Sequence, residues 1–382
     1  MSPLVLTLIP IALLTSLAAT WLARFVGRKL NAMDGAGVAG QVKAPPRRVP
    51  NIGGVGIFLG FAIPLVGALL YFAGFSAMKD STLLAVPERM REHLSGLQSK
   101  TVDAWLILAA AFILHILGLI DDRKPLGPFL KLFILAGVSL AALMLTHTRM
   151  FTMLDPLVGG TWASYALTLL WVLVVTNALN FLDNMDGLSA GVATVAGACF
   201  LAIALLAGQW FIAAMLALLV GSMLGFLWFN KPPASIFMGD GGSLVIGFLL
   251  AFLSVRITYS HTQHDAITWH AVFTPLVVLA VPLYDFTSVV LLRLKQGKSP
   301  FVGDLQHVSH RLVNRGLSKP LAVVTICGLA GVVGLAGVLL PTATATEATL
   351  IACQVALLLI VLAIMEFGGT PGVSPIRGNR EP

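Results

Sequence analysis

The sequence predicts an all-α, polytopic integral membrane protein that forms a single membrane domain over residues 1–382. Hydrophobic residues make up 57% of the chain, and charged residues make up only 11%. A soluble domain usually carries about 25% charged residues. The mean hydropathy is +0.91. The chain also contains a succession of apolar runs of about 20 residues, the length that crosses a bilayer as a helix.

These runs predict eleven transmembrane helices. The first, 4–26, has no basic leading segment and no clear small-residue cleavage site, so we expect a retained span and not a signal peptide. The second and third are 52–73 and 104–120, and the third ends at Asp121. The pair 188–207 and 209–229 is separated only by Gly208. The remaining runs are 129–147, 163–182, 237–256, 271–292, 321–340 and 348–367.

The basic residues set the expected orientation, because Lys and Arg accumulate in cytoplasmic loops. With the N-terminus outside, the inner segments hold sixteen Lys and Arg residues and the outer segments hold six. We therefore expect an inner (cytoplasmic) membrane protein whose C-terminus and active site face the cytoplasm. The same rule explains the net charge of +7, so we expect no nucleic-acid partner.

Acidic, amide and histidine side chains gather at the predicted inner ends of the helices. Helix capping or loop solvation would explain each group alone, but acidic groups in a bilayer usually face a cavity or a partner. Their concentration on one side predicts one convergent site. The segments are "GLIDDRKPLGPFLKL", "NALNFLDNMDGLSAG", "FNKPPASIFMGDGGS", "VPLYDF" and "GKSPFVGDLQHVSHRL".

The residue types at this site favour a hard cation and a phosphate-bearing substrate. Carboxylates with amide oxygens suit Mg²⁺, which binds through one or two carboxylates plus substrate phosphates. Neighbouring cations such as Arg123, Lys131 and Arg311 suit phosphates, and the glycines around Asp240 would let the backbone approach one. The residues predict Mg²⁺-dependent phosphoryl transfer at the inner membrane face, with a lipid as one substrate.

The five segments, with "VPNIGGVGIFLGF" near the start, resemble the polyprenyl-phosphate N-acetylhexosamine-1-phosphate transferases of glycosyl transferase family 4. They stand in the family's order over residues 28–315. The resemblance implies transfer of a sugar 1-phosphate from a UDP-N-acetylhexosamine to undecaprenyl or another polyprenyl phosphate, with release of UMP. It also implies Mg²⁺, or Mn²⁺ in its place, as cofactor. We also keep a homodimer as a candidate assembly.

Residue roles follow from the resemblance alone. Asp240, with Asp121, is implied as the metal ligand, and Asp121 or Asp122 as the base near the lipid phosphate. Asp183 and Asp186 would lie on the nucleotide and pyrophosphate side, and His307 and His310 near phosphates. The implied substrate-binding residues are Lys43, Lys131, Asn177, Asn180, Asn230, Phe237, Asp285, Asp304 and Arg311; Asn230 and Phe237 would hold the uracil. Direct attack by the lipid phosphate and a covalent phospho-enzyme both remain open.

Four positions depart from the family pattern. Ser309 stands where the family usually has the middle histidine of its last motif, and Asn184 stands where a glycine usually separates the two aspartates. In the early loop, Pro45 and Asn51 replace the usual His and Arg. These changes predict altered sugar specificity or reduced activity.

The stretch "HVSHRL" favours the UDP-GlcNAc branch, because the branch that uses UDP-MurNAc-pentapeptide usually has a denser histidine run. The peptidoglycan enzyme is the alternative within the family. Alternatives of another class are a membrane transporter and a non-catalytic polyprenyl-phosphate-binding protein. A transporter would place its acids near the bilayer midplane, whereas here they cluster at helix ends.

Overall fold

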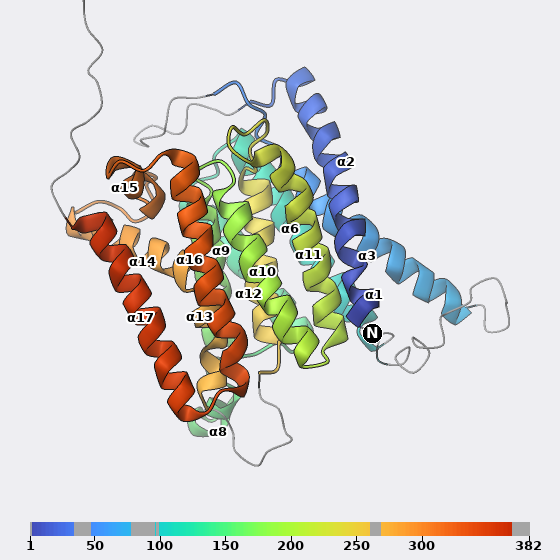
Figure 1. Cartoon of the computed structure of the whole chain (residues 1–382). Coiled ribbons are helices and arrows are strands. Elements are labelled where there is room, and N and C mark those ends of the chain that lie inside the picture. The colour runs from blue at the N-terminus through green and yellow to red at the C-terminus, as the bar shows by residue number, and fades with distance from the viewer. Residues whose placement is uncertain (1, 34–46, 78–95, 97–98, 260–268, 369–382) are drawn as a thin grey trace, which may run out of the picture.

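The computed structural model describes residues 2–33, 47–77, 96, 99–259 and 269–368, and the helices within these ranges form one bundle (Figure 1). The described residues hold nine helices that are long and apolar enough to cross a membrane, or ten if one bent pair counts as a single span. The all-helical, multi-pass prediction is confirmed. The count of eleven stays a prediction, because the predicted span 237–256 is a helix of only 17 residues.

The predicted runs correspond to helices whose ends differ by a few residues. The long helices are α2 (Leu8–Lys29), α3 (Gly54–Ala77), α6 (Thr101–Arg123), α7 (Pro128–Leu145), α9 (Trp162–Leu182), α10 (Leu188–Leu206), α11 (Trp210–Asn230), α12 (Asp240–Arg256), α14 (Ala280–Lys295), α16 (Lys319–Leu339) and α17 (Ala345–Phe367). The short helices are α1 (Ser2–Leu6), α8 (Asp155–Val158), α13 (Thr274–Val278) and α15 (Val308–Asn314).

One predicted helix is sharply bent, and a second has a one-residue interruption within a single candidate span, Ser2–Lys29; each feature lies just before a proline. The segment expected as 271–292 bends by 70° between α13 and α14, and α13 ends four residues before Pro282. The segment expected as 4–26 divides into α1 and α2, and α1 ends four residues before Pro10. Proline has no N–H to donate to the carbonyl four residues earlier, so the helical ladder is interrupted there. Pro64 nevertheless lies inside α3, which remains one helix.

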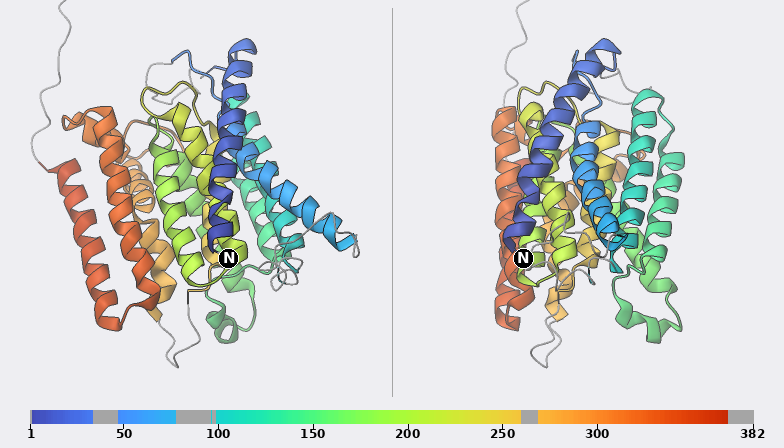
Figure 2. Two further views of the ribbon diagram at one scale, coloured as in Figure 1. Left: turned by 45° about the vertical axis from the view of Figure 1, so that its right-hand side comes forward. Right: turned by 90° about the vertical axis from the view of Figure 1, so that its right-hand side faces the viewer.

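Helix α12 forms the centre of the bundle. Its residues from Gly241 to Ser254 are all buried, and it packs against α6, α9, α3, α10 and α11. A helix that is apolar on every face belongs in such a core. The two further views show most helices lying alongside one another, while α3 leans away from the bundle (Figure 2). Asp240, the first residue of α12, is thereby fixed at the end of the most enclosed helix.

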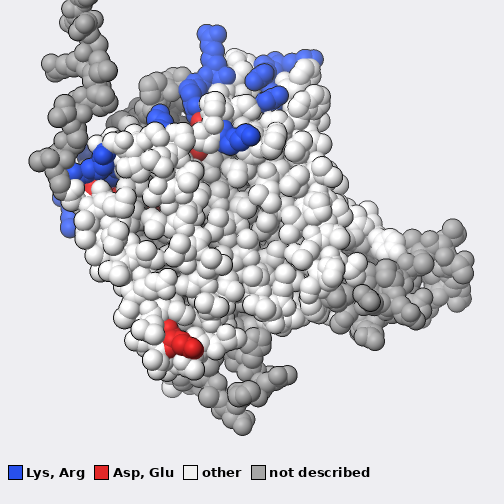
Figure 3. Space-filling view, in the orientation of Figure 1, with Lys and Arg blue, Asp and Glu red and all other residues white. Residues whose placement is uncertain are grey.

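On one face of the molecule, the two ends of the bundle differ in charge. The N-terminus lies at one end, and α17 finishes at the other, where α2 also ends and α15 lies (Figure 1). On the face shown in Figure 3, the blue Lys and Arg side chains gather at this second end, above a wide band without charge. This distribution matches the pattern expected of basic cytoplasmic loops.

Candidate active site

Three polar clusters lie around the connection between α9 and α10. The carboxylate cluster consists of Asp121, Asp122, Lys131, Asn180 and Asp240. The histidine cluster centres on Asp285 and His307, and the arginine cluster on Arg47 and Asp186. The stretch from Asn180 to Asp186 contributes to all three: Asn180 contacts Asp240, Asn184 contacts Ser309, and Asp186 contacts Arg47.

In the carboxylate cluster, one cation joins α7 to α6 and α12, and Asn180 adds α9 through Asp240. Lys131, from α7, forms a close ion pair with Asp240 and lies 3.1 Å from the Oδ2 atom of Asp121. The other oxygen of Asp240 accepts a 2.7 Å hydrogen bond from the Asn180 amide, which also contacts the Ser243 hydroxyl. Most of each ionised side chain is shielded from solvent. The predicted convergence of these acids is therefore present in the structure.

Asp122 is used differently from its neighbour Asp121. Its carboxylate accepts hydrogen bonds from the backbone N–H groups of Asp240, at 3.0 Å, and Gly241, at 3.2 Å. Asp122, at the end of α6, thus caps the start of α12. The unpaired N–H groups at a helix N-terminus favour such a negative charge. Asn51 adds a further donor at 3.1 Å. Asp121 has a single backbone donor, Leu126, at 2.7 Å, in addition to Lys131.

The carboxylate cluster has the donor chemistry that Mg²⁺ requires. Among the described residues, no group of three His, Cys, Asp or Glu side chains is arranged as a complete metal site. Mg²⁺ commonly needs only one or two carboxylates, because substrate phosphates and waters supply the other ligands. Asp121 and Asp240 both contact the Lys131 ammonium, so their oxygens already converge on one positive charge. These residues fit a magnesium ion shared with a phosphate.

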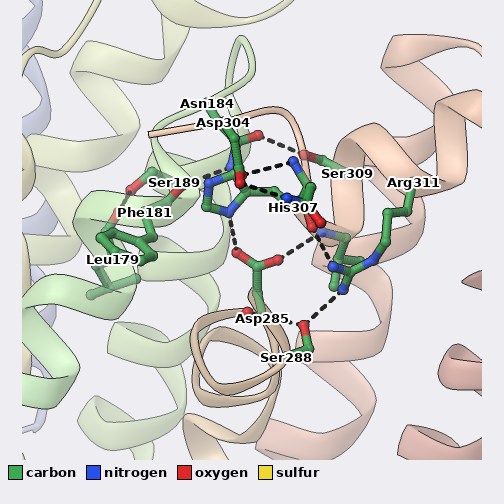
Figure 4. Close-up of polar contacts among 12 residues, drawn as sticks. Leu179, Phe181, Asn184, Ser189, Asp285, Ser288, Asp304, His307, Ser309 and Arg311 are labelled. Atoms are coloured by element: carbon green, nitrogen blue, oxygen red, sulfur yellow. Dashed lines mark hydrogen bonds and ion pairs between the residues drawn. The ribbon is translucent and has the colours of Figure 1, made fainter. Parts of the chain in front are cut away.

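The histidine cluster is organised by a buried carboxylate. Asp285 is 1% exposed and accepts a 2.9 Å hydrogen bond from Nδ1 of His307 and a 2.7 Å bond from the Val308 N–H. Figure 4 shows Asp285 reaching from α14 toward His307. The Phe181 ring meets the His307 ring edge-on at 5.7 Å. These contacts fix the orientation of His307 and hold the start of α15.

His310 lies one helical turn further along α15. Burial lowers its pKa to about 4, and the nearby His307 acts in the same direction. His310 is therefore neutral at neutral pH and can accept a proton or a hydrogen bond.

The pKa of His310 predicts a pH-dependent stability. The ordinary histidine value is 6.5, so between about pH 6.5 and pH 4 the unfolded chain binds a proton that the folded chain does not. Stability from this residue is therefore lost as the pH falls through that window. His310→Gln should flatten the decline in the thermal unfolding midpoint between pH 7 and pH 5. Identical pH profiles for both proteins would contradict this expectation.

The arginine cluster contains a residue that the sequence did not single out. Arg47 forms a close ion pair with Asp186, whose Oδ2 atom also accepts a 2.9 Å hydrogen bond from the Ala234 N–H. The Arg47 guanidinium lies 4.7 Å from the centre of the Phe237 ring. The only signal in the sequence was its place among the basic residues of the first inner loop. The structure brings Asp186 and Phe237 together around this one arginine.

Other predicted site residues have partners within the protein. Asn177 donates to the Leu173 carbonyl of its own helix, and Asn230 donates to Ile236 and accepts from Gly187. Arg293 pairs with Asp304. Burial raises the pKa of Asp304, but Arg293 and the hydrogen bonds from Gln306 together lower it. The Asp183 N–H donates to the Asn180 carbonyl at the end of α9. The substrate roles of these residues stay predictions, and Lys43 and Pro45 lie outside the described residues.

The Arg311 guanidinium is held by α17, which lies beyond the resembling segments. It contacts Glu366 at 2.7 Å and the Ser288 hydroxyl at 2.7 Å. The Glu366 side chain is fully buried. The sequence analysis did not identify Glu366 as a partner of Arg311, because a single acid at the end of an apolar run gives no sign of its partner. The predicted phosphate contact of Arg311 stays a prediction.

Comparison with known proteins places this geometry in a family. The model of glycosyl transferase family 4 matches residues 104–258. The probable undecaprenyl-phosphate N-acetylglucosaminyl 1-phosphate transferase of Bacillus subtilis is 28% identical over 87% of this chain and 84% of its own length. The undecaprenyl-phosphate alpha-N-acetylglucosaminyl 1-phosphate transferase of Escherichia coli K12 is 28% identical over 72% of each chain.

A third relative is slightly more similar in sequence to this chain than these two. The decaprenyl-phosphate N-acetylglucosaminephosphotransferase of Mycobacterium tuberculosis H37Rv is 30% identical over 74% of this chain and 70% of its own length. The matched regions include the segments that carry the carboxylate cluster. On this similarity and the family match, the chain belongs to glycosyl transferase family 4.

Proposed function

We propose that the protein transfers GlcNAc 1-phosphate from UDP-GlcNAc to undecaprenyl phosphate, or another polyprenyl phosphate, and releases UMP. The reaction would be a first membrane step of cell-envelope polysaccharide synthesis. The relatives named for this activity favour it over the peptidoglycan enzyme, a transporter or a non-catalytic binding protein. The observation that carries the proposal is the convergence of Asp121, Asp240 and Lys131 at one end of a membrane bundle.

The reaction we propose is a direct displacement. An oxygen of the lipid phosphate forms a bond to the sugar-bearing phosphorus of the UDP-sugar. The bond from that phosphorus to the bridging oxygen breaks, and UMP leaves with the electron pair. A covalent phospho-enzyme on an aspartate is the competing route. Isolation of an enzyme that carries the sugar phosphate would favour that route.

We assign the base to Asp121 and a positioning role to Asp122. Asp122 is already occupied by the N–H groups of Asp240 and Gly241 and by Asn51. Asp121 has fewer donors and contacts Lys131, so it is better placed to keep a lipid phosphate deprotonated. Lys131 would exchange its carboxylate partners for phosphate oxygens during binding. Asp186, Arg47 and Phe237 would form the nucleotide side of a cleft.

Asp240 would hold Mg²⁺, or Mn²⁺ in its place, while Asp121 keeps the role of base. The ion would neutralise charge on the pyrophosphate. Asn180 orients Asp240 through a 2.7 Å hydrogen bond, which keeps its other oxygen directed toward Lys131.

A water-soluble UDP-sugar requires the site to face the cytoplasm. We therefore propose an inner-membrane protein of eleven spans, with the N-terminus outside and the C-terminus inside. The gathering of Lys and Arg at the site end of the bundle supports this orientation (Figure 3). A homodimer remains part of the proposal.

The function predicts UMP release from the full chain in detergent with undecaprenyl phosphate, Mg²⁺ and UDP-GlcNAc. UDP-MurNAc-pentapeptide and UDP-GalNAc serve as parallel donors, and UMP is measured by a coupled assay. We expect release with UDP-GlcNAc, its loss with EDTA, and its return when Mg²⁺ is added. Release with UDP-MurNAc-pentapeptide alone would assign the peptidoglycan reaction instead. Folded protein that binds the lipid but releases no UMP would overturn catalysis.

A further inference from the structure

A short hydrogen bond links two of the positions at which this chain departs from its family. The Ser309 hydroxyl donates to Oδ1 of Asn184 at 2.5 Å, although the two residues are 125 positions apart. Figure 4 shows the two side chains pointing toward one another, above His307 and Asp285. Two departures that look independent in the sequence are therefore in direct contact.

The Asn184 side chain belongs to the turn that separates Asp183 from Asp186. Its amide nitrogen donates to the Phe181 carbonyl at 2.7 Å, so the carboxamide is fixed at both ends. Its oxygen faces α15, and its nitrogen closes the end of α9. The orientation of the turn that carries both aspartates is thus tied to α15.

Ser309 lies in the first turn of α15, between His307 and His310, and is completely buried. Asp285 holds the same turn from α14, through His307 and the Val308 N–H. The first turn of α15 therefore has two polar anchors, one on α14 and one in the turn between α9 and α10. Loss of the Asn184 anchor would leave the hydrogen bonds to Asp285 as the polar anchor of this turn.

The sizes of the two side chains are complementary. An imidazole at position 309 would need the space that the Asn184 carboxamide now fills, and a glycine at position 184 would leave that space empty. Ser309 is small enough to fit beside Asn184 and still donates to it. Closely packed interiors tolerate such changes when volume and hydrogen bonding are both kept.

We infer that Asn184 and Ser309 form one coupled positioning pair, which sets the aspartate turn of the donor side against the His307–His310 turn. Asn184 stands in place of the usual glycine and Ser309 in place of the usual histidine, and we regard the two substitutions as one compensating change. The inference rests on the proposed function, because the aligned turns matter only if the substrate lies between them. Neither residue needs to touch substrate.

A double-mutant cycle tests the coupling through UMP release. Asn184→Gly leaves the buried Ser309 hydroxyl without its partner and should lower kcat about 10-fold. Ser309→His must displace the carboxamide and should lower kcat about 30-fold. The double variant restores the complementary sizes and should return to within about 3-fold of wild type. Effects that simply multiply in the double variant would overturn the inference.

The milder Ser309→Ala variant separates positioning from general destabilisation. A positioning defect should lower kcat while KM for UDP-GlcNAc stays within about 2-fold. Ser254→Ala is the matched control, because Ser254 is also fully buried and contacts Trp171 across helices at 3.1 Å. Equal losses of kcat in the two variants would reduce Ser309 to an ordinary core residue and overturn the inference.

Hydrogen exchange gives a readout that does not depend on turnover. Ser309→Ala should speed amide exchange across residues 183–190, and Ser254→Ala should leave those amides unchanged. If the wild type releases no UMP with any donor, the proposed function fails, and this exchange result still decides whether the pair holds the turn. Unchanged exchange in Ser309→Ala would overturn the pairing itself.

Discussion

Asp240→Asn is expected to lower UMP release by about 1000-fold or more, because the Asp240 residue contacts most other members of the carboxylate cluster. Asp240 accepts from Asn180, forms an ion pair with Lys131 and begins α12 beside Asp122. Asparagine keeps the size of the side chain but removes its charge. Lys131 would then have only Asp121 as an anionic partner in this cluster, and the proposed metal would lose its main ligand.

The measurement is kcat for UMP release over a range of Mg²⁺ concentrations. Asp155→Asn is the matched control, because Asp155 forms an ion pair with Arg149 but belongs to α8, away from the carboxylate cluster. It should retain nearly full activity. Asp240→Asn protein that keeps more than about a tenth of wild-type kcat would show that the charge of Asp240 is not central to catalysis.

The sequence predicted the helices and the acids well because both depend on local information. Apolar runs of the length that crosses a bilayer identify a span without reference to its neighbours, and acids at helix ends are conspicuous in such a chain. The bend before Pro282 was missed. Pro64 shows why: the same residue type stays inside a continuous α3, so surrounding contacts decide whether a proline breaks the helix.

Side-chain partners could not be predicted, because they depend on how distant helices meet. Asn177 and Asn180 are one turn apart, yet Asn177 bonds to its own backbone whereas Asn180 contacts Asp240. Helical spacing places residues on a shared face but does not specify what lies opposite. Arg47 and Glu366 were missed for the same reason, since their partners Asp186 and Arg311 are far away in the sequence.

The departures from the family pattern show this limit most clearly. Asn184 and Ser309 were each interpreted as a separate change, and their hydrogen bond became visible only in the folded chain. Asn51 is similar. It stands where the family usually has an arginine, and in the structure it donates to Asp122 at 3.1 Å. The neutral Asn51 amide thus donates to the carboxylate that also accepts from the N–H groups at the start of α12.

Gly118→Ala is expected to cause the second large loss, and it acts without removing any polar group. The α6 backbone presses against the start of α12 at this glycine, and an added Cβ would collide with the main-chain atoms of Asp240 and Gly241. Backbone cannot rotate away as a side chain can, so one helix must move. Overpacking of this kind costs about 3 kcal/mol, and a 1 Å displacement of a reacting group can lower a rate about 100-fold.

Gly137→Ala provides the control for Gly118→Ala, because Gly137 also lies within a long helix but an added Cβ there meets no atom within 4 Å. Alanine favours a helix over glycine by about 1 kcal/mol, so Gly137→Ala should unfold no earlier than wild type and keep its UMP release. Gly118→Ala should unfold earlier and lose about 100-fold in kcat. If both variants behaved alike, close contact between α6 and α12 would not be what positions Asp240. The contrasting result would show that the carboxylate cluster depends on a backbone contact that only glycine permits.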